Sequence, residues 1–150
     1  MAGNAERYAW LNGEYVEWPE ARIHVSTAAV LTGGSVFEGL RGYSDPDERQ
    51  VYVFRLPEHL TRLRQSMKIM RMTPPYPSEE LAAVCAELVV RNGFREDVQI
   101  RPTVFFGEGG LFAHTPDRHR GVRPGDPTSL HTRRRAGDRL LRQRLATPRR

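Results

Sequence analysis

Two stretches of the chain have the apolar spacing of an amphipathic helix. After Pro57, apolar residues recur at intervals of three and four up to Met70, and a second such run extends from Ser78 to Asn92-Gly93. Pro57 suits the first turn of a helix, and Ser78 suits an N-cap. We therefore predict two helices that share a core. The core residues predicted on their inner faces are Leu60, Leu63, Met67, Leu81, Val84, Cys85 and Leu88.

Other stretches have the composition and alternation of β-strands. Asn12-Gly13 between two apolar runs predicts a β-hairpin over residues 10–16, because both turn residues must adopt positive φ. Further strands are predicted from β-branched and aromatic residues at Arg22–Val25, Ser35–Tyr43, Val51–Arg55 and Val98–Phe106. Pro102 cannot donate to a strand ladder, so it predicts an edge position or a bulge. Strands in runs with helices between some of them indicate an α+β fold.

The charge of the chain is concentrated at one end. The net charge is +5, yet residues 1–115 carry 12 Lys and Arg against 15 Asp and Glu, whereas residues 116–150 carry 11 Arg against 3 Asp. The second segment has no aromatic residue, so it cannot bury enough apolar surface to offset its ordering entropy. We predict a folded domain over 1–115 and a mostly irregular, arginine-rich tail over 116–150.

This tail allows a second interpretation, in which the chain is a non-enzymatic module that binds nucleic acid. Eleven arginines would give weak, salt-dependent binding to phosphates. The tail lacks interleaved aromatic residues on which bases could stack, so this interpretation is disfavoured.

Several classes of protein are excluded by simple counts. No run of 18 apolar residues exists, so no transmembrane helix is expected. The N-terminus lacks a basic segment followed by an apolar one, so no signal peptide is expected either. Cys85 is the only cysteine, which excludes an internal disulfide and fits a cytoplasmic location. The five histidines show no metal-ligand spacing with Cys85, so no metal site is expected.

The predicted strand at residues 35–43 is the most distinctive part of the chain. One of its faces would carry Val36, Glu38, Leu40 and Gly42. The other face would carry Phe37, Gly39, Arg41 and Tyr43. Gly39 weakens a strand, which indicates a close approach of backbone or ligand. The residue types alone also fit an ordinary edge strand with one solvated face.

Three motifs, in this order, resemble one known family. They are SVFEGLRGY at residues 35–43, RLPEHLTRL at residues 55–63 and IRP at residues 100–102. They are similar to motifs in the N-terminal domain of branched-chain amino acid aminotransferases, which are class IV aminotransferases with the type IV fold of pyridoxal-phosphate enzymes. The resemblance covers about residues 8–113 and then stops. D-amino acid aminotransferase and aminodeoxychorismate lyase share this fold and remain alternatives, although the FEGLR run favours the branched-chain group.

The resemblance implies a chemistry and a set of site residues. The cofactor would be pyridoxal 5′-phosphate, and the intact enzyme would be a homo-oligomer that transfers the amino group of leucine, isoleucine or valine to 2-oxoglutarate. Arg62 matches the arginine that binds the cofactor phosphate, which suits a permanently charged, bidentate guanidinium. Phe37 matches an aromatic residue that lines the pocket for the apolar side chain of the substrate. Arg101 matches an arginine near the substrate carboxylate, and Arg41 is a weaker candidate for the substrate site.

The chain also departs from the family pattern. Close relatives often have tyrosine at the positions of Thr32 and Gln99, which puts the substrate specificity in doubt. The lysine that forms the Schiff base with the cofactor would lie in a C-terminal domain, and Lys68, the single lysine here, matches no catalytic motif. We therefore expect a fragment with no catalytic residue of its own, inactive by itself. The abrupt loss of family character suggests a truncated or frameshifted reading frame.

Overall fold

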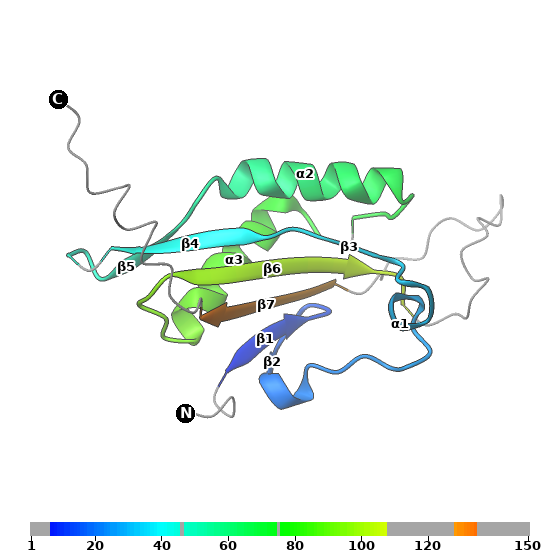
Figure 1. Cartoon of the computed structure of the whole chain (residues 1–150), viewed down its shortest axis with the longest axis horizontal. Coiled ribbons are helices and arrows are strands. Elements are labelled where there is room, and N and C mark those ends of the chain that lie inside the picture. The colour runs from blue at the N-terminus through cyan, green and yellow to red at the C-terminus, as the bar shows by residue number, and fades with distance from the viewer. Residues whose placement is uncertain (1–6, 46, 75, 108–127, 135–150) are drawn as a thin grey trace.

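The computed structural model describes residues 7–45, 47–74, 76–107 and 128–134, and these form an antiparallel sheet with the two long helices on one side (Figure 1). The strands are β1 (Tyr8–Leu11), β2 (Glu14–Glu17), β3 (Ser35–Phe37), β4 (Leu40–Asp45), β5 (Gln50–Val53), β6 (Val98–Phe105) and β7 (Thr128–Arg134). The helices are the 3-10 helix η2 (Trp18–Glu20), α1 (Ala28–Thr32), α2 (Leu56–Ile69) and α3 (Ser78–Arg91). The predicted α+β class is confirmed.

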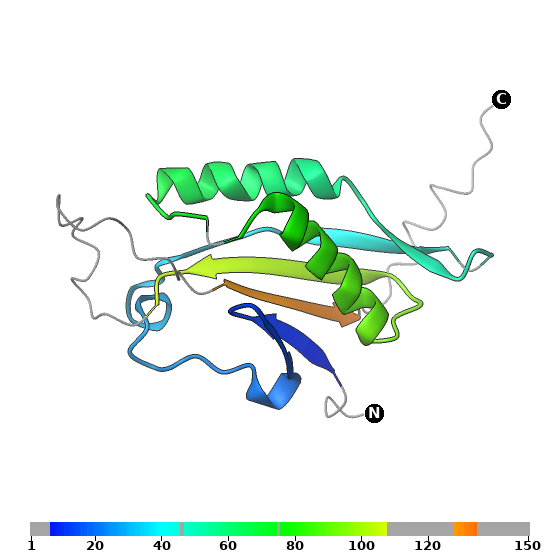
Figure 2. The same ribbon diagram turned by 180° about the vertical axis from the view of Figure 1, so that it is seen from behind.

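The helices α2 and α3 pack on the same face of the sheet. Figure 2 shows α3 crossing in front of the strands, while α2 runs along the side where β3 and β4 lie. All seven core residues predicted from the helical spacing are buried, and they join strand residues in one cluster. The strand residues at its centre are Trp10, Leu40, Val98, Ile100 and Val104. The shared core of the two helices is therefore confirmed, and the sheet supplies its other half.

The strands follow the order β2-β1-β7-β6-β4-β5, and β3 also pairs with β6. Phe37 lies opposite Thr103, and Leu40 lies opposite Ile100, so β3 and β4 meet β6 in one continuous register. Only Glu38 and Gly39 separate the two strands. The chain from β3 to β4 is thus a single extended segment with a short interruption.

Pro102 accounts for this interruption, although not in the way that the sequence predicts. It lies in β6, a central strand with partners on both sides, and the continuous register contains no bulge. Its carbonyl accepts a hydrogen bond of 3.0 Å from the Glu38 N–H. In an antiparallel strand, the N–H and C=O of one residue point to the same neighbouring strand. A residue other than proline at position 102 would therefore direct its N–H to Glu38 as well, and proline has no N–H to direct there. The expectation of an edge or a bulge is wrong, and the ladder is instead interrupted on the partner strand.

Three local predictions have different outcomes. The Asn12-Gly13 hairpin is confirmed, with φ of 53° and 99° at the two turn residues. The N-cap of α3 is Pro77 rather than Ser78, whose hydroxyl instead accepts a hydrogen bond of 2.5 Å from Arg64 Nε. No strand forms at Arg22–Val25, where all four residues are exposed.

The strand β7 comes from the arginine-rich tail and lies between β1 and β6. It pairs with β6 along its whole length, from Val98 opposite Arg134 to Val104 opposite Thr128. The prediction of irregular structure is wrong for these seven residues, because backbone hydrogen bonds to two flanking strands do not depend on side-chain composition. Residues 116–127 and 135–150 lie outside the described residues, so the boundary after residue 115 stays a prediction, as does nucleic-acid binding by the tail.

Candidate functional site

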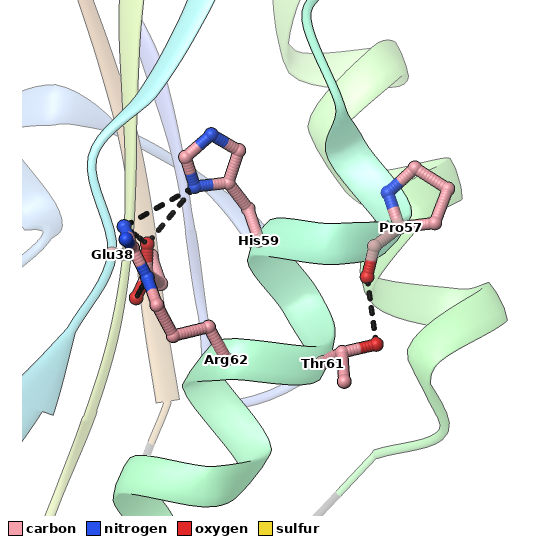
Figure 3. A network of polar contacts seen from close by, with 5 residues as sticks. All are labelled: Glu38, Pro57, His59, Thr61 and Arg62. Carbon is pink, nitrogen blue, oxygen red and sulfur yellow. Dashed lines mark hydrogen bonds and ion pairs between the residues drawn. The ribbon is translucent and has the colours of Figure 1, made fainter.

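The link between β3 and β4 carries a buried acidic residue that contacts α2. Glu38 is 5% exposed, and Figure 3 shows its carboxylate between His59 and Arg62. Its Oε1 accepts a hydrogen bond of 2.7 Å from Arg62 Nε, and its Oε2 accepts one of 2.5 Å from Arg62 Nη2. His59 Nδ1 lies 3.0 Å from the same Oε2. Residues three apart on a helix share a face, so α2 presents both side chains to Glu38.

The contacts determine the charge state of this cluster. The hydrogen bonds from Arg62 hold the pKa of the Glu38 carboxyl below its ordinary value, against the opposing effect of burial, and His59 adds to the lowering. Glu38 in turn raises the pKa of Arg62. The cluster is therefore an ion pair at neutral pH, with the anion inside and the cation at the surface.

Arg62 has N–H donors that Glu38 does not use in this arrangement. A guanidinium carries five N–H donors in a planar fork, and Glu38 takes the edge formed by Nε and Nη2. The edge formed by Nη1 and Nη2 points the other way, and no described residue hydrogen-bonds to Nη1. The Arg62 side chain is 63% exposed, so this outer edge is open to a ligand. Thr61, one position earlier, turns away and donates its hydroxyl proton to the Pro57 carbonyl (Figure 3).

Phe37 and Arg101 lie on the opposite face of the sheet. Val36 pairs with Val104 in the core, and alternation along β3 turns the next side chain, Phe37, away from the helices. The guanidinium of Arg101 lies over the Phe37 ring, 4.4 Å from its centre. Phe37 is 54% exposed, so it is not the core phenylalanine that its residue type alone would suggest. A cation and an aromatic ring therefore form one exposed pair on this face.

Arg41 belongs to the same face as Arg101. It pairs with Gln99 across β4 and β6 and is exposed. Among the described residues, a Cβ added to Gly39 would meet nothing closer than Gln99 Nε2 at 3.7 Å, so none of their backbone atoms requires a glycine there. Thr32 lies at the end of α1, where its hydroxyl donates to the carbonyl of Ala28. Of the two departures from the family pattern, Gln99 is thus the one beside the arginines.

The candidate residues lie around an open edge of the sheet rather than in a single cleft. Arg62 and Glu38 meet on the helix side, whereas Phe37 and Arg101 meet on the other side. The strand β5 pairs with β4 only from Gly42 onward, so the segment that carries Phe37 and Glu38 has β6 on one side and no strand on the other among the described residues. The joint match of Arg62, Phe37 and Arg101 to the family motifs predicts that they face a common cleft, and this prediction is wrong, because they lie on two faces that meet at this edge.

A hollow of about 320 Å³ lies farther along the face opposite α2 and α3. Ser35, Thr103 and Phe105 line it together with Trp18 and Ile23. It contains none of the four predicted site residues. Within the described part of the chain, no three acidic, histidine or cysteine side chains come together as a metal site, and no helix has the length and apolarity to cross a bilayer.

The motif comparison missed Glu38 and His59. One signal was present in the sequence: Glu38 shares its strand face with the apolar residues Val36 and Leu40, so burial of that face would also bury an acid. A buried carboxylate requires a cation. The nearby helix offered Arg62 and, three residues earlier, His59. Pairing them required the packing of α2 on the sheet, which the sequence does not specify.

Comparison with known proteins places these elements in one family. The model of the amino-transferase class IV family matches residues 35–124. The branched-chain-amino-acid aminotransferase of Salmonella typhimurium is 39% identical over 109 residues, which are 73% of this chain and 34% of that protein. The chain thus spans about a third of the length of the curated relatives it matches, and it corresponds to their N-terminal part.

Solved structures agree with the sequence comparison. The branched-chain amino acid aminotransferase of Escherichia coli has a TM-score of 0.74 at 32% identity, covering 85% of this chain and 39% of the other. That of Thermoproteus uzoniensis, solved with norvaline, has a TM-score of 0.72 at 34% identity, covering 84% and 40%. Since the family match covers more than half of the chain and includes every element that carries Phe37, Glu38, Arg62 and Arg101, the chain belongs to the pyridoxal-phosphate-dependent class IV aminotransferases.

Proposed function

We propose that this chain is the phosphate-binding N-terminal unit of a branched-chain amino acid aminotransferase. One observation carries the proposal: Arg62, at the position of the family's phosphate-binding arginine, is anchored by a buried carboxylate and keeps an open outer edge. The curated relatives favour the branched-chain group over D-amino acid aminotransferase and aminodeoxychorismate lyase. The intact enzyme would be a cytoplasmic homo-oligomer that passes amino groups from leucine, isoleucine or valine to 2-oxoglutarate.

The cofactor of this family would be held here through its phosphate. The residues present fit that part of the group, because Nη1 of Arg62 hydrogen-bonds to no described residue and can donate to a phosphate oxygen. Nη2, beside it, donates to Glu38 and lies 3.4 Å from His59 Nδ1. When bound, pyridoxal 5′-phosphate supplies the electron sink for amino-group transfer. Gly39 lies at the edge that β5 does not cover, and a ligand bound there would lie next to both faces of the sheet.

The pair on the other face would recognise the substrate. The exposed Phe37 ring offers an apolar wall for an aliphatic side chain, and Arg101 offers a cation for a carboxylate. In the absence of a ligand, the ring provides Arg101 with a cation–π contact of about 0.5–1 kcal/mol at an exposed site. A bidentate carboxylate would bind more strongly, so Arg101 can leave the ring when substrate arrives. Arg41 adds positive charge to the same face.

We further propose that the chain by itself does not catalyse transamination. The reaction requires an amine that carries the cofactor and moves a proton, and Lys68 is the single lysine of the chain. Lys68 lies six positions after Arg62 on α2, which turns it about 120° away from Arg62 around the helix axis. It is exposed, and its position on the helix directs it away from the outer edge of Arg62. The lysine would come from the remaining two thirds of the intact enzyme.

The experiment compares two ligands that differ only in the phosphate. Pyridoxamine 5′-phosphate and pyridoxamine have no aldehyde, so neither can react with Lys68, and the ratio of their affinities isolates the phosphate. Arg62→Ala should abolish the preference for the phosphorylated ligand. Lys68→Ala removes one positive charge from the same helix and should leave the preference unchanged, which controls for net charge. An equal effect of the two substitutions would refute the phosphate site.

Activity is tested separately. The full chain is incubated with pyridoxal 5′-phosphate, leucine and 2-oxoglutarate, and the formation of glutamate is followed. We expect no turnover above that of the cofactor alone. Turnover that disappears in Lys68→Ala would overturn this part of the proposal and make Lys68 catalytic.

A further inference from the structure

We propose that Glu38 is a positioning residue, which fixes the guanidinium of Arg62 so that its Nη1 and Nη2 edge is ready for the cofactor phosphate. The inference rests on the proposed function, because it concerns the same phosphate site. The motifs that identify the family assign no role to Glu38. Its role follows from its contacts and from its place in the sheet.

An exposed arginine ordinarily samples many rotamers, and Arg62 is mostly exposed. Glu38 restrains it through two parallel hydrogen bonds, of 2.7 Å to Nε and 2.5 Å to Nη2. Two bonds in one plane determine both the position and the rotation of the guanidinium. The outer edge is then directed away from the sheet before any ligand binds.

Glu38, which restrains Arg62, is itself held in place by its surroundings. Glu38 is buried, and its N–H donates to the carbonyl of Pro102 in the central strand β6. His59 Nδ1 holds the carboxylate from a third direction, at 3.0 Å from Oε2. The exposed guanidinium is thereby connected to the centre of the sheet. A ligand that binds such a restrained donor loses less free energy to side-chain ordering than one that must order a free arginine.

Glu38 has a second effect on a phosphate, and the two effects oppose each other. Its negative charge repels the ligand, so a dominant charge effect would make Glu38 an inhibitory counter-ion. Glu38→Asp separates the two effects because it keeps the charge and shortens the side chain by one methylene. With the backbone held by Pro102, the shorter carboxylate cannot keep both hydrogen bonds to Arg62. A change in phosphate affinity in this variant therefore reports orientation.

The test uses the full chain as wild type, Glu38→Asp and Arg62→Ala. Pyridoxamine 5′-phosphate and pyridoxamine are titrated while nuclear magnetic resonance follows the Nε–Hε signal of Arg62. In the wild type this signal should be that of a fixed side chain, because Nε donates to Glu38. In Glu38→Asp it should become averaged, and the phosphate-dependent part of the affinity should fall about two- to tenfold, as expected for one side chain that must be ordered on binding. Circular dichroism verifies that each variant is folded.

Each outcome supports or refutes a separate statement. Unchanged phosphate preference in Arg62→Ala would refute the phosphate site, and the proposed function with it. Loss in Arg62→Ala together with wild-type or tighter binding in Glu38→Asp would refute positioning by Glu38 and leave the phosphate site standing. A freely averaged Arg62 signal in the wild type would refute positioning as well, and this measurement does not depend on the folding of any variant.

Discussion

Gly42 is the position at which a single added methyl group should disturb the sheet most clearly. It is buried in β4, between Val53 of β5 and Val98 of β6. A Cβ at Gly42 would lie 2.7 Å from Val98 Cγ2 and 2.8 Å from Val51 Cγ1. Both contacts are too short for carbon atoms, whose optimal separation is about 3.5–4.0 Å. The glycine is therefore required by packing, and not by an unusual backbone conformation.

The loss of stability expected for Gly42→Ala depends on whether the neighbouring side chains can move away from the added methyl group. Val98 is enclosed in the core, and a β-branched side chain has few alternative rotamers, so it cannot turn away from the new methyl. Overpacking of this kind costs about 1–3 kcal/mol, and alanine recovers about 0.4–1 kcal/mol by restricting the unfolded chain. We expect Gly42→Ala to lower the free energy of unfolding by about 1–2 kcal/mol, which corresponds to a fall in Tm of about 4–16 °C for a domain of this size.

The assay is thermal and urea-induced unfolding of the full chain. Gly39→Ala is the matched control, because its Cβ would have 3.7 Å of clearance at a site away from the crowded one. We expect it to change stability by less than about 0.5 kcal/mol. In a Val51→Ala background the cost of Gly42→Ala should shrink, since one of the two short contacts is removed. Wild-type stability in Gly42→Ala, or an equal loss in Gly39→Ala, would refute the reasoning.

Three further predictions concern the core and the ion pair. Leu88→Ala in α3, at a position with 0% exposure, should cost about 2–5 kcal/mol in urea unfolding, whereas Val90→Ala, at 72% exposure, should cost less than about 0.5 kcal/mol. The lowered pKa of Glu38 means that its contribution to stability is present above the ordinary carboxyl pKa of 4.5 and is lost as the pH falls through the folded-state value. Wild type and Glu38→Gln should thus approach each other in stability as the pH falls below about 4.5, and a constant difference would contradict the ion pair. Burial raises the pKa of the Cys85 thiol to about 12, so a thiol reagent should label Cys85 in urea and leave it unmodified in the native chain.

Features that depend on neighbours along the chain could be predicted from the sequence. Helical spacing identified the buried faces of α2 and α3, and the Asn12-Gly13 pair identified a hairpin, because both signals are complete within a few residues. The alternation at residues 35–43 likewise placed Leu40 and Phe37 on opposite faces, and the structure then showed that the face of Leu40 is the buried one. The resemblance to class IV aminotransferases then indicated Arg62 as a site residue, since its motif is contiguous.

Features that join distant segments were decided by the tertiary structure alone. Glu38 and Arg62 are 24 positions apart, and their pairing arises from the packing of α2 beside β3. The strand β7 forms from an arginine-rich sequence because β1 and β6 offer backbone partners on both sides. Pro102 is accepted in a central strand because its missing donor faces the interruption at Glu38. In each case a backbone or charged group is satisfied by a partner far away in the chain, and no local pattern encodes which partner that will be.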